Sequence, residues 1–210
     1  MARFLTRLKT RLLSPFRHRR MKSDLAKNIE HGEIIRVIIS PGGSSIQPGW
    51  CGTEYVFFDM TKAEDWARTF PPSAKLSRIL SEHVFEHLTL AQSSKALELA
   101  YRHLMEGGLI RIAVPDGNNP NPEYIEQVRP GGAGPGAADH KMLWTKESLA
   151  ETLEQAGFRP RPLEWFDQDG TSYTADWDPA DGFVHRSVKY GKPNATFPDS
   201  HRSLIIDGLR

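Results

Sequence analysis

The stretch Ile34-Ile35-Arg36-Val37-Ile38-Ile39 is an almost continuous run of β-branched residues. A run of this kind is typical of a strand that is buried on both faces of a parallel sheet. Leu109-Ile110-Arg111-Ile112-Ala113-Val114 is a similar run, and residues 91–105 before it carry apolar side chains at helical spacing, with Gly107-Gly108 as the predicted stop. This alternation predicts an α/β fold with a Rossmann-like, doubly wound, mostly parallel sheet and helices on both faces.

Other segments continue the same rhythm along the chain. We expect strands over residues 55–58, 76–80, 161–166 and 204–206, and a helix that Thr145 caps and Gly157 ends. Residues 115–136 hold five prolines and five glycines, which predicts a long loop. A chain of 210 residues with 39% hydrophobic residues is long enough for one such domain.

The composition excludes several classes of protein. Its apolar runs are far shorter than the roughly 20 residues of a membrane-spanning helix, so an integral membrane protein is not expected. The single cysteine, Cys51, excludes an internal disulfide framework and fits a reducing compartment. The sequence therefore favours a cytoplasmic location.

The charge of the chain is unevenly distributed. Residues 1–23 hold eight Lys and Arg and no acid, which leaves 19 basic and 26 acidic residues, a net charge of −7, in the rest. A negative body argues against nucleic acid as its partner. Helical spacing predicts a helix over residues 1–14 that Pro15 ends. This basic arm, residues 1–30, either packs on the domain of residues 31–210, frays, lies on the inner face of the membrane, or binds nucleic acid.

A glycine-containing turn follows the first predicted strand. It reads Ser40-Pro41-Gly42-Gly43, and glycines let the backbone approach a ligand closely. Asp59 comes twenty residues after Ile39, at the predicted end of the second strand, where an acid accepts hydrogen bonds from a ribose diol. A tight turn with Asp59 as a helix cap explains the same residues equally well.

Two Glu-His pairs follow the strand expected over residues 76–80. On a helix, His83 and His87 would lie on one face. The metalloprotease order His-Glu-x-x-His is not present, so we predict no metal site. The segment either lines a ligand pocket, where a histidine is suited to proton transfer, or fills a structural role. Further along, His140 either closes over that pocket or lies on the surface.

The segment Ser81-Glu82-His83-Val84-Phe85-Glu86-His87-Leu88, followed by Gly107-Gly108-Leu109-Ile110-Arg111-Ile112-Ala113-Val114-Pro115-Asp116, resembles the core of class I S-adenosylmethionine-dependent methyltransferases. It is similar in particular to small bacterial members with EHxxEHL and RIAVPD motifs. The resemblance extends over residues 31–210 and implies the class I methyltransferase fold, with S-adenosylmethionine as the cofactor. Its specificity for the family is high, and it does not identify an acceptor.

The resemblance also implies roles for the residues at the predicted strand ends. The cofactor-binding residues implied are Ser40, Gly42, Gly43, Asp59, Met60, Ser81, Glu82 and His83. If the acceptor is a hydroxyl, a base must take its proton, and the candidates are His83, His140 and Asp116. The implied function is methyl transfer to a small molecule or a sugar. One alternative function remains. In that alternative, the Ser40-Pro41 variant of the turn belongs to a domain that has lost the cofactor and acts as a binding or scaffold protein.

Overall fold

The computed structural model describes residues 2–42, 46–191 and 202–210. Its elements, in chain order, are α1 Ala2–Glu30, β1 Ile34–Ile39, β2 Cys51–Gly52, α2 Ala63–Thr69, β3 Lys75–Glu82, the 3-10 helix η1 Phe85–His87, α3 Leu90–His103, β4 Leu104–Pro115, α4 Pro122–Val128, η2 Ala137–Asp139, α5 Lys146–Gln155, β5 Arg159–Phe166, β6 Ser172–Thr174, η3 Pro179–Asp181 and β7 Ser203–Leu209.

The described strands form one sheet of seven, in the order β2-β1-β3-β4-β7-β5-β6. Strands β2, β1, β3 and β4 pair in parallel, whereas β7 is antiparallel to both β4 and β5. Strand β5 therefore runs in the same direction as β4, and most of the sheet is parallel. The predicted Rossmann-like α/β fold with a mostly parallel sheet is confirmed.

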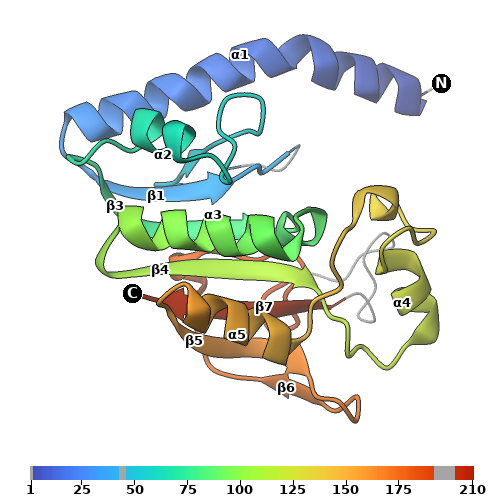
Figure 1. Cartoon of the computed structure of the whole chain (residues 1–210). Helices are drawn as coiled ribbons and strands as arrows, with labels where there is room; N and C mark the ends of the chain where they lie inside the picture. Colours follow the sequence, from blue (N-terminus) through green and yellow to red (C-terminus); the bar gives the residue numbers. More distant parts are fainter. Residues whose placement is uncertain (1, 43–45, 192–201) are drawn as a thin grey trace.

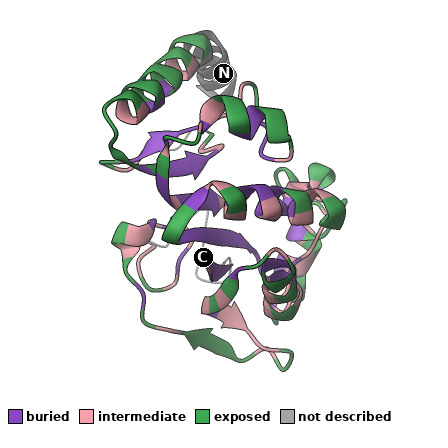
Figure 2. Ribbon diagram, turned by 60° about the vertical axis from the view of Figure 1, so that its left-hand side comes forward, coloured by how far each residue is buried: buried purple, intermediate pink, exposed green. Residues whose placement is uncertain are grey.

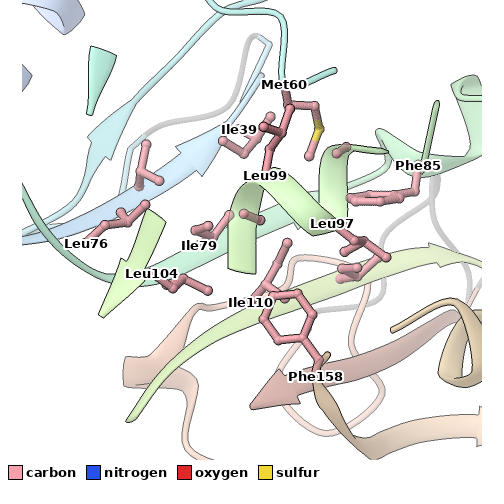
Figure 3. Close-up of a cluster of buried hydrophobic side chains, with 14 of the residues drawn as sticks. Ile39, Met60, Leu76, Ile79, Phe85, Leu97, Leu99, Leu104, Ile110 and Phe158 are labelled. Carbon is pink, nitrogen blue, oxygen red and sulfur yellow. The ribbon is translucent and has the colours of Figure 1, made fainter. Parts of the chain in front are cut away.

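One face of the sheet is covered by helices. Buried side chains of α2, α3 and α5 pack on it, as does Leu25 of α1. Figure 1 shows α3 and α5 in front of the sheet and α1 along its β1–β2 side. Figure 3 shows the centre of this core, with Ile39, Ile79 and Ile110 from three neighbouring strands and with Leu97 and Leu99 of α3. The strands at the middle of the molecule are accordingly buried, and the outer faces of the helices are exposed (Figure 2).

The other face is covered differently from the prediction. Its buried cluster combines strand residues such as Leu80 and Ile205 with Trp177 and Val184, and no described α-helix contributes a buried side chain to it. An irregular segment, residues 177–190, takes the place of a helix there.

Two buried charges on the sheet hold segment 177–190 in place. The guanidinium of Arg111 donates to the carbonyl oxygens of Asp178 and Gly182, at 2.9 and 2.7 Å. The carboxylate of Glu164 accepts hydrogen bonds from four donors of the segment: Trp177 Nε1, Ser187 Oγ, Val188 N and Lys189 N. The polar groups of this irregular cover therefore find partners on the sheet that it covers.

The predicted strand over residues 55–58 is wrong. Cys51–Gly52 is the strand beside β1, and residues 55–57 form a turn in which Phe57 N and Phe58 N both donate to Glu54 O. Tyr55 and Val56 are 70% and 71% exposed, whereas Phe58 is buried against Trp66 and Phe70. The apolar run thus supplies one core residue and no strand.

Three further predictions need correction. Helix α1 passes through Pro15 to Glu30, because Met21 and Leu25 beyond the proline are buried against the domain. Gly107-Gly108 lie inside β4, at an irregularity where the pairing with β3 jumps from Leu104 to Leu109, so they do not end α3. The predicted loop over residues 115–136 contains the short helix α4, which Asn121 caps.

The division into an arm of residues 1–30 and a domain of residues 31–210 stays a prediction. No helix in the described part of the chain is both long and apolar enough to cross a membrane.

Candidate functional site

The chain reverses its direction of travel across the sheet between β1 and β3. It moves outward from β1 to β2 and then returns to the other side of β1 with β3. In open α/β sheets, ligands bind beyond the carboxyl ends of the strands at such a switch point. Ile39 and Ser81 are paired there, so Ser40 and Glu82 begin the segments that border the site.

The turn after β1 is open toward solvent at its glycine. Ser40 and Gly42 both adopt left-handed backbone conformations, with φ of 47° and 57°. A Cβ atom added to Gly42 would meet no atom of the described residues within 4 Å, so these residues leave room for a ligand at the Gly42 backbone. The guanidinium of Arg17, on α1, donates to the Gly42 carbonyl oxygen. The predicted ligand Gly43 lies outside the described residues.

Glu54 is an acid at this turn that the sequence analysis missed. It stands two residues past the end of β2, and its carboxylate lies close enough to the Gly42 backbone N–H for that group to lower its pKa. Burial raises the pKa of Glu54 above its ordinary value, against the opposing charges of Arg17 and His18. No local pattern marks Glu54, because β2 is only two residues long and the apolar run that follows it predicts a strand in its place.

Asp59 and Met60 lie farther along the same connection and are both buried. One Asp59 carboxylate oxygen accepts hydrogen bonds from Thr61 N and Thr61 Oγ1, at 3.0 and 2.7 Å, and the other lies 3.6 Å from Lys62 Nζ. These contacts fix the turn that leads into α2. A role for Asp59 and Met60 in binding a cofactor stays a prediction.

The end of β3 is tied to segment 177–190. One carboxylate oxygen of Glu82 lies 2.9 Å from His185 Nδ1, and the other accepts a hydrogen bond from Arg186 N. The hydrogen bond to Glu82 raises the pKa of His185. The hydroxyl oxygen of Ser81 is buried and has no hydrogen-bond partner among the described residues.

His83 links two buried polar side chains. Its Nδ1 lies 2.9 Å from Glu86 Oε1, and its Nε2 lies 3.0 Å from Ser203 Oγ. Burial raises the pKa of Glu86, but the charge and hydrogen bond of His83 outweigh it and hold that pKa below its ordinary value. Because an ionised carboxylate only accepts hydrogen bonds, Nδ1 of the His83 ring donates to Glu86.

His83 and His87 do not share a helix face as predicted. His83 has a left-handed backbone (φ 56°), and the 3-10 helix η1 begins only at Phe85. His87 faces His140 instead, with ring centroids 4.8 Å apart. Three possible metal ligands meet here, because one ligand atom each of Glu86, His87 and His140 lies within 4.8 Å of the other two. Of the predicted bases, His83 and His140 therefore both lie around Glu86, which the sequence analysis did not single out.

Asp116, the third predicted base, is buried, and backbone N–H groups occupy both of its carboxylate oxygens. One oxygen accepts from Asn118 N at 3.0 Å and the other from Phe166 N at 2.8 Å. Burial, which outweighs these two hydrogen bonds, raises the pKa of Asp116 to about 6. Its contacts anchor the loop after β4 to β5.

This raised pKa predicts a pH dependence of stability. The folded protein binds the Asp116 proton more tightly than the unfolded chain does, so this group destabilises the fold above pH 6 and ceases to do so as the pH falls toward 4. The unfolding free energy of the wild type, relative to that of Asp116→Asn, should therefore rise by about 2 kcal/mol when the pH falls from about 7.5 to about 4.5. Denaturant titrations of both proteins check this, and a pH-independent difference between them contradicts it.

No protein-family model matches the sequence, and no curated protein matches it either. Among solved structures, the chain is similar to an O-methyltransferase family protein from Burkholderia thailandensis, at 10% identity and a TM-score of 0.50, over 96% of this chain and 57% of that one. The chain has the fold of class I methyltransferases. Similar structures also include S-adenosylmethionine-dependent methyltransferases from Archaeoglobus fulgidus (16% identity, 95% and 98% coverage, TM-score 0.49) and Thermotoga maritima (13%, 99% and 96%, TM-score 0.45).

Proposed function

We propose that this protein is an S-adenosylmethionine-dependent methyltransferase that transfers a methyl group to an oxygen of a small molecule or a sugar. The observation that carries the proposal is the position of the open Gly42 turn and the Glu54 carboxylate near each other, beyond the carboxyl ends of adjacent parallel strands β1 and β2. An acid in that position is suited to the diol of a ribose, beside a turn that lets a ligand approach the backbone. The motifs of residues 81–88 and 107–116, and the fold, support the same function.

The residues at the switch point have distinct tasks in this proposal. When bound, S-adenosylmethionine supplies a methyl group on a sulfonium, which is already a good leaving centre. The turn around Ser40 and Gly42 holds its amino-acid part, and Glu54 or Asp59 binds its ribose. Ser81, Glu82 and His83 border the opposite side. Positioning of the acceptor then supplies much of the rate, with His83, His140 and Asp116 as the candidate bases.

Calorimetric titration with S-adenosylmethionine and S-adenosylhomocysteine tests the cofactor. We expect binding to the wild type, weakened about 10- to 100-fold in Glu54→Gln, because a hydrogen bond to a charged group is worth about 1.5–3 kcal/mol. Asp59→Asn, tested in parallel, shows whether the predicted acid contributes. Glu98→Gln is the matched control, since Glu98 lies on the exposed side of α3 in a pair with Lys95.

The second candidate function is a binding or scaffold protein that has lost the cofactor. The turn itself favours it, because Ser40 adopts a left-handed conformation that is strained for a residue with a Cβ, and Pro41 has no N–H to donate. Folded protein that is free of ligand and binds neither compound supports this alternative and contradicts the methyltransferase. Binding that Glu54→Gln leaves unchanged keeps the enzyme but removes Glu54 from its site.

The setting of the protein belongs to the same proposal. A cytoplasmic location, with the basic arm in contact with the inner face of the membrane, fits the basic residues Arg17, Arg19, Arg20 and Lys22 of α1. Nucleic acid is disfavoured as a partner, because the rest of the chain has a net charge of −7.

A further inference from the structure

We propose that Glu86, His87 and His140 bind a divalent transition metal, with Zn²⁺ as the best match. Each side chain offers one ligand atom, and the three atoms lie within 4.8 Å of one another. Binding requires the three side chains to close in until each ligand atom lies roughly 2.0–2.2 Å from the ion, the usual distance for imidazole nitrogen and carboxylate oxygen on Zn²⁺. The site is separate from the cofactor turn after β1 and adds to the proposed methyl transfer.

The carboxylate of Glu86 has one oxygen without a partner in a buried position. Glu86 is 1% exposed, and its Oε2 makes no hydrogen bond to any described residue. A buried charged oxygen that lacks a partner is costly, and native structures seldom leave one without a reason. The other oxygen, Oε1, is held by His83, so Oε2 is the atom available to a cation.

The two histidines are arranged as metal ligands usually are. Nδ1 of His140 lies 2.6 Å from the Val128 carbonyl oxygen and must donate a hydrogen bond to it, because a carbonyl oxygen only accepts. The lone pair of Nε2 is therefore available to a metal. The His87 ring contacts the His140 ring edge to face and makes no hydrogen bond to any described residue. In the same way, His83 orients the Glu86 carboxylate from behind.

Backbone hydrogen bonds hold the two ligand-bearing segments together. Lys141 N and Met142 N both donate to the Glu86 carbonyl oxygen, at 2.7 and 3.2 Å, and Trp144 Nε1 donates to the Phe85 carbonyl oxygen. His140 is therefore fixed next to η1 although the two lie more than fifty residues apart in the sequence. The fold already holds these side chains near one another, so binding a metal requires little further ordering of the chain.

The ligand set indicates the class of metal. Two imidazoles and one carboxylate suit Zn²⁺, Fe²⁺ and Co²⁺, whereas Mg²⁺ and Ca²⁺ prefer oxygen ligands. Three protein ligands leave a coordination position for water or for an oxygen of a bound molecule, as in catalytic rather than structural zinc sites.

Titration of metal-free, full-length protein with Zn²⁺ against a chromophoric chelator tests the proposal. We expect one equivalent to bind, and a rise in Tm of about 5–10 °C at a free Zn²⁺ concentration of about 100 times Kd. Co²⁺ bound at the same site should show visible ligand-field absorption. His87→Asn, His140→Asn and Glu86→Gln should each weaken Zn²⁺ binding by at least the roughly 10- to 100-fold that the loss of a partner of a metal ligand costs.

His31→Asn is the matched control, because His31 is exposed in the turn after α1 and its loss removes one imidazole without touching the cluster. His87→Asn is the decisive variant, since His87 is half-buried and its replacement breaks no hydrogen bond, so the variant should fold normally. The proposal is overturned if the wild type takes up no Zn²⁺, or if His31→Asn weakens binding as much as His87→Asn. No cofactor is present in these measurements, so their failure is distinguishable from failure of the proposed methyltransferase.

Discussion

Replacing Asp207 by alanine is expected to destabilise the protein by about 3–5 kcal/mol, because the change leaves a buried guanidinium without its counter-ion. Asp207 on β7 and Arg111 on β4 are both 0% exposed and form two parallel hydrogen bonds, of 2.7 and 3.0 Å. A loss of that size is a large part of the roughly 5–15 kcal/mol by which a native domain is stable.

The remaining contacts of Arg111 do not replace the carboxylate. Its guanidinium donates to the Asp178 and Gly182 carbonyl oxygens and lies 4.4 Å from the ring centroid of Trp177, but none of these carries a negative charge. Loss of Asp207 should therefore also loosen segment 177–190, which Arg111 holds against the sheet.

Denaturant unfolding followed by circular dichroism measures the effect, and Arg161→Ala is the matched control. Arg161 donates to the same carboxylate at 2.7 Å, but its side chain is 46% exposed, so its removal should cost less than about 1 kcal/mol. If Asp207→Ala costs no more than Arg161→Ala, the buried pair does not have the role assigned to it.

Where the sequence predicted the fold well, the information was local and periodic. The β-branched run of β1 and the Thr145 cap of α5 are features of a few neighbouring residues, and both are found in the structure. The predicted strand over residues 55–58 failed because hydrophobicity alone does not separate a strand from a turn that buries one aromatic residue. Strand β2 has two residues, Cys51 and Gly52, which is too short for any period to be visible.

The candidate site was predictable only in part, because it depends on contacts between distant segments. The position of His83 at the end of a strand pointed to the site from the sequence. The pairing of His87 with His140 results from the hydrogen bonds of residues 141 and 142 to Glu86, which no local pattern encodes. The cover of the second face likewise depends on Arg111 and Glu164, whose partners lie far along the chain.

Replacing His83 by asparagine is expected to lower the rate of methyl transfer to a hydroxyl acceptor by about 10²- to 10⁴-fold, the usual contribution of a general base. Glu86 fixes the ring through Nδ1 and leaves Nε2 as the proton-accepting atom. Nε2 lies 3.0 Å from Ser203 Oγ, so an acceptor hydroxyl must take the place of that side-chain hydroxyl, which is easier to displace than a backbone N–H. Among the candidates, Asp116 is the least suited, because both of its oxygens accept backbone hydrogen bonds.

Release of S-adenosylhomocysteine, measured with an acceptor found by screening small molecules and glycans, gives the rate, and cofactor binding to each variant is checked by calorimetry. Ser203→Ala is the control for the geometry, because it removes a hydroxyl from Nε2 and leaves the ring and Glu86 in place, so it should retain most of the activity. A base at His140 instead predicts that His140→Asn loses activity while His83→Asn retains it.

Unchanged turnover in both histidine variants, with cofactor still bound, contradicts a histidine base. The acceptor must then lose its proton without help from these histidines, or bind in a form that is already ionised.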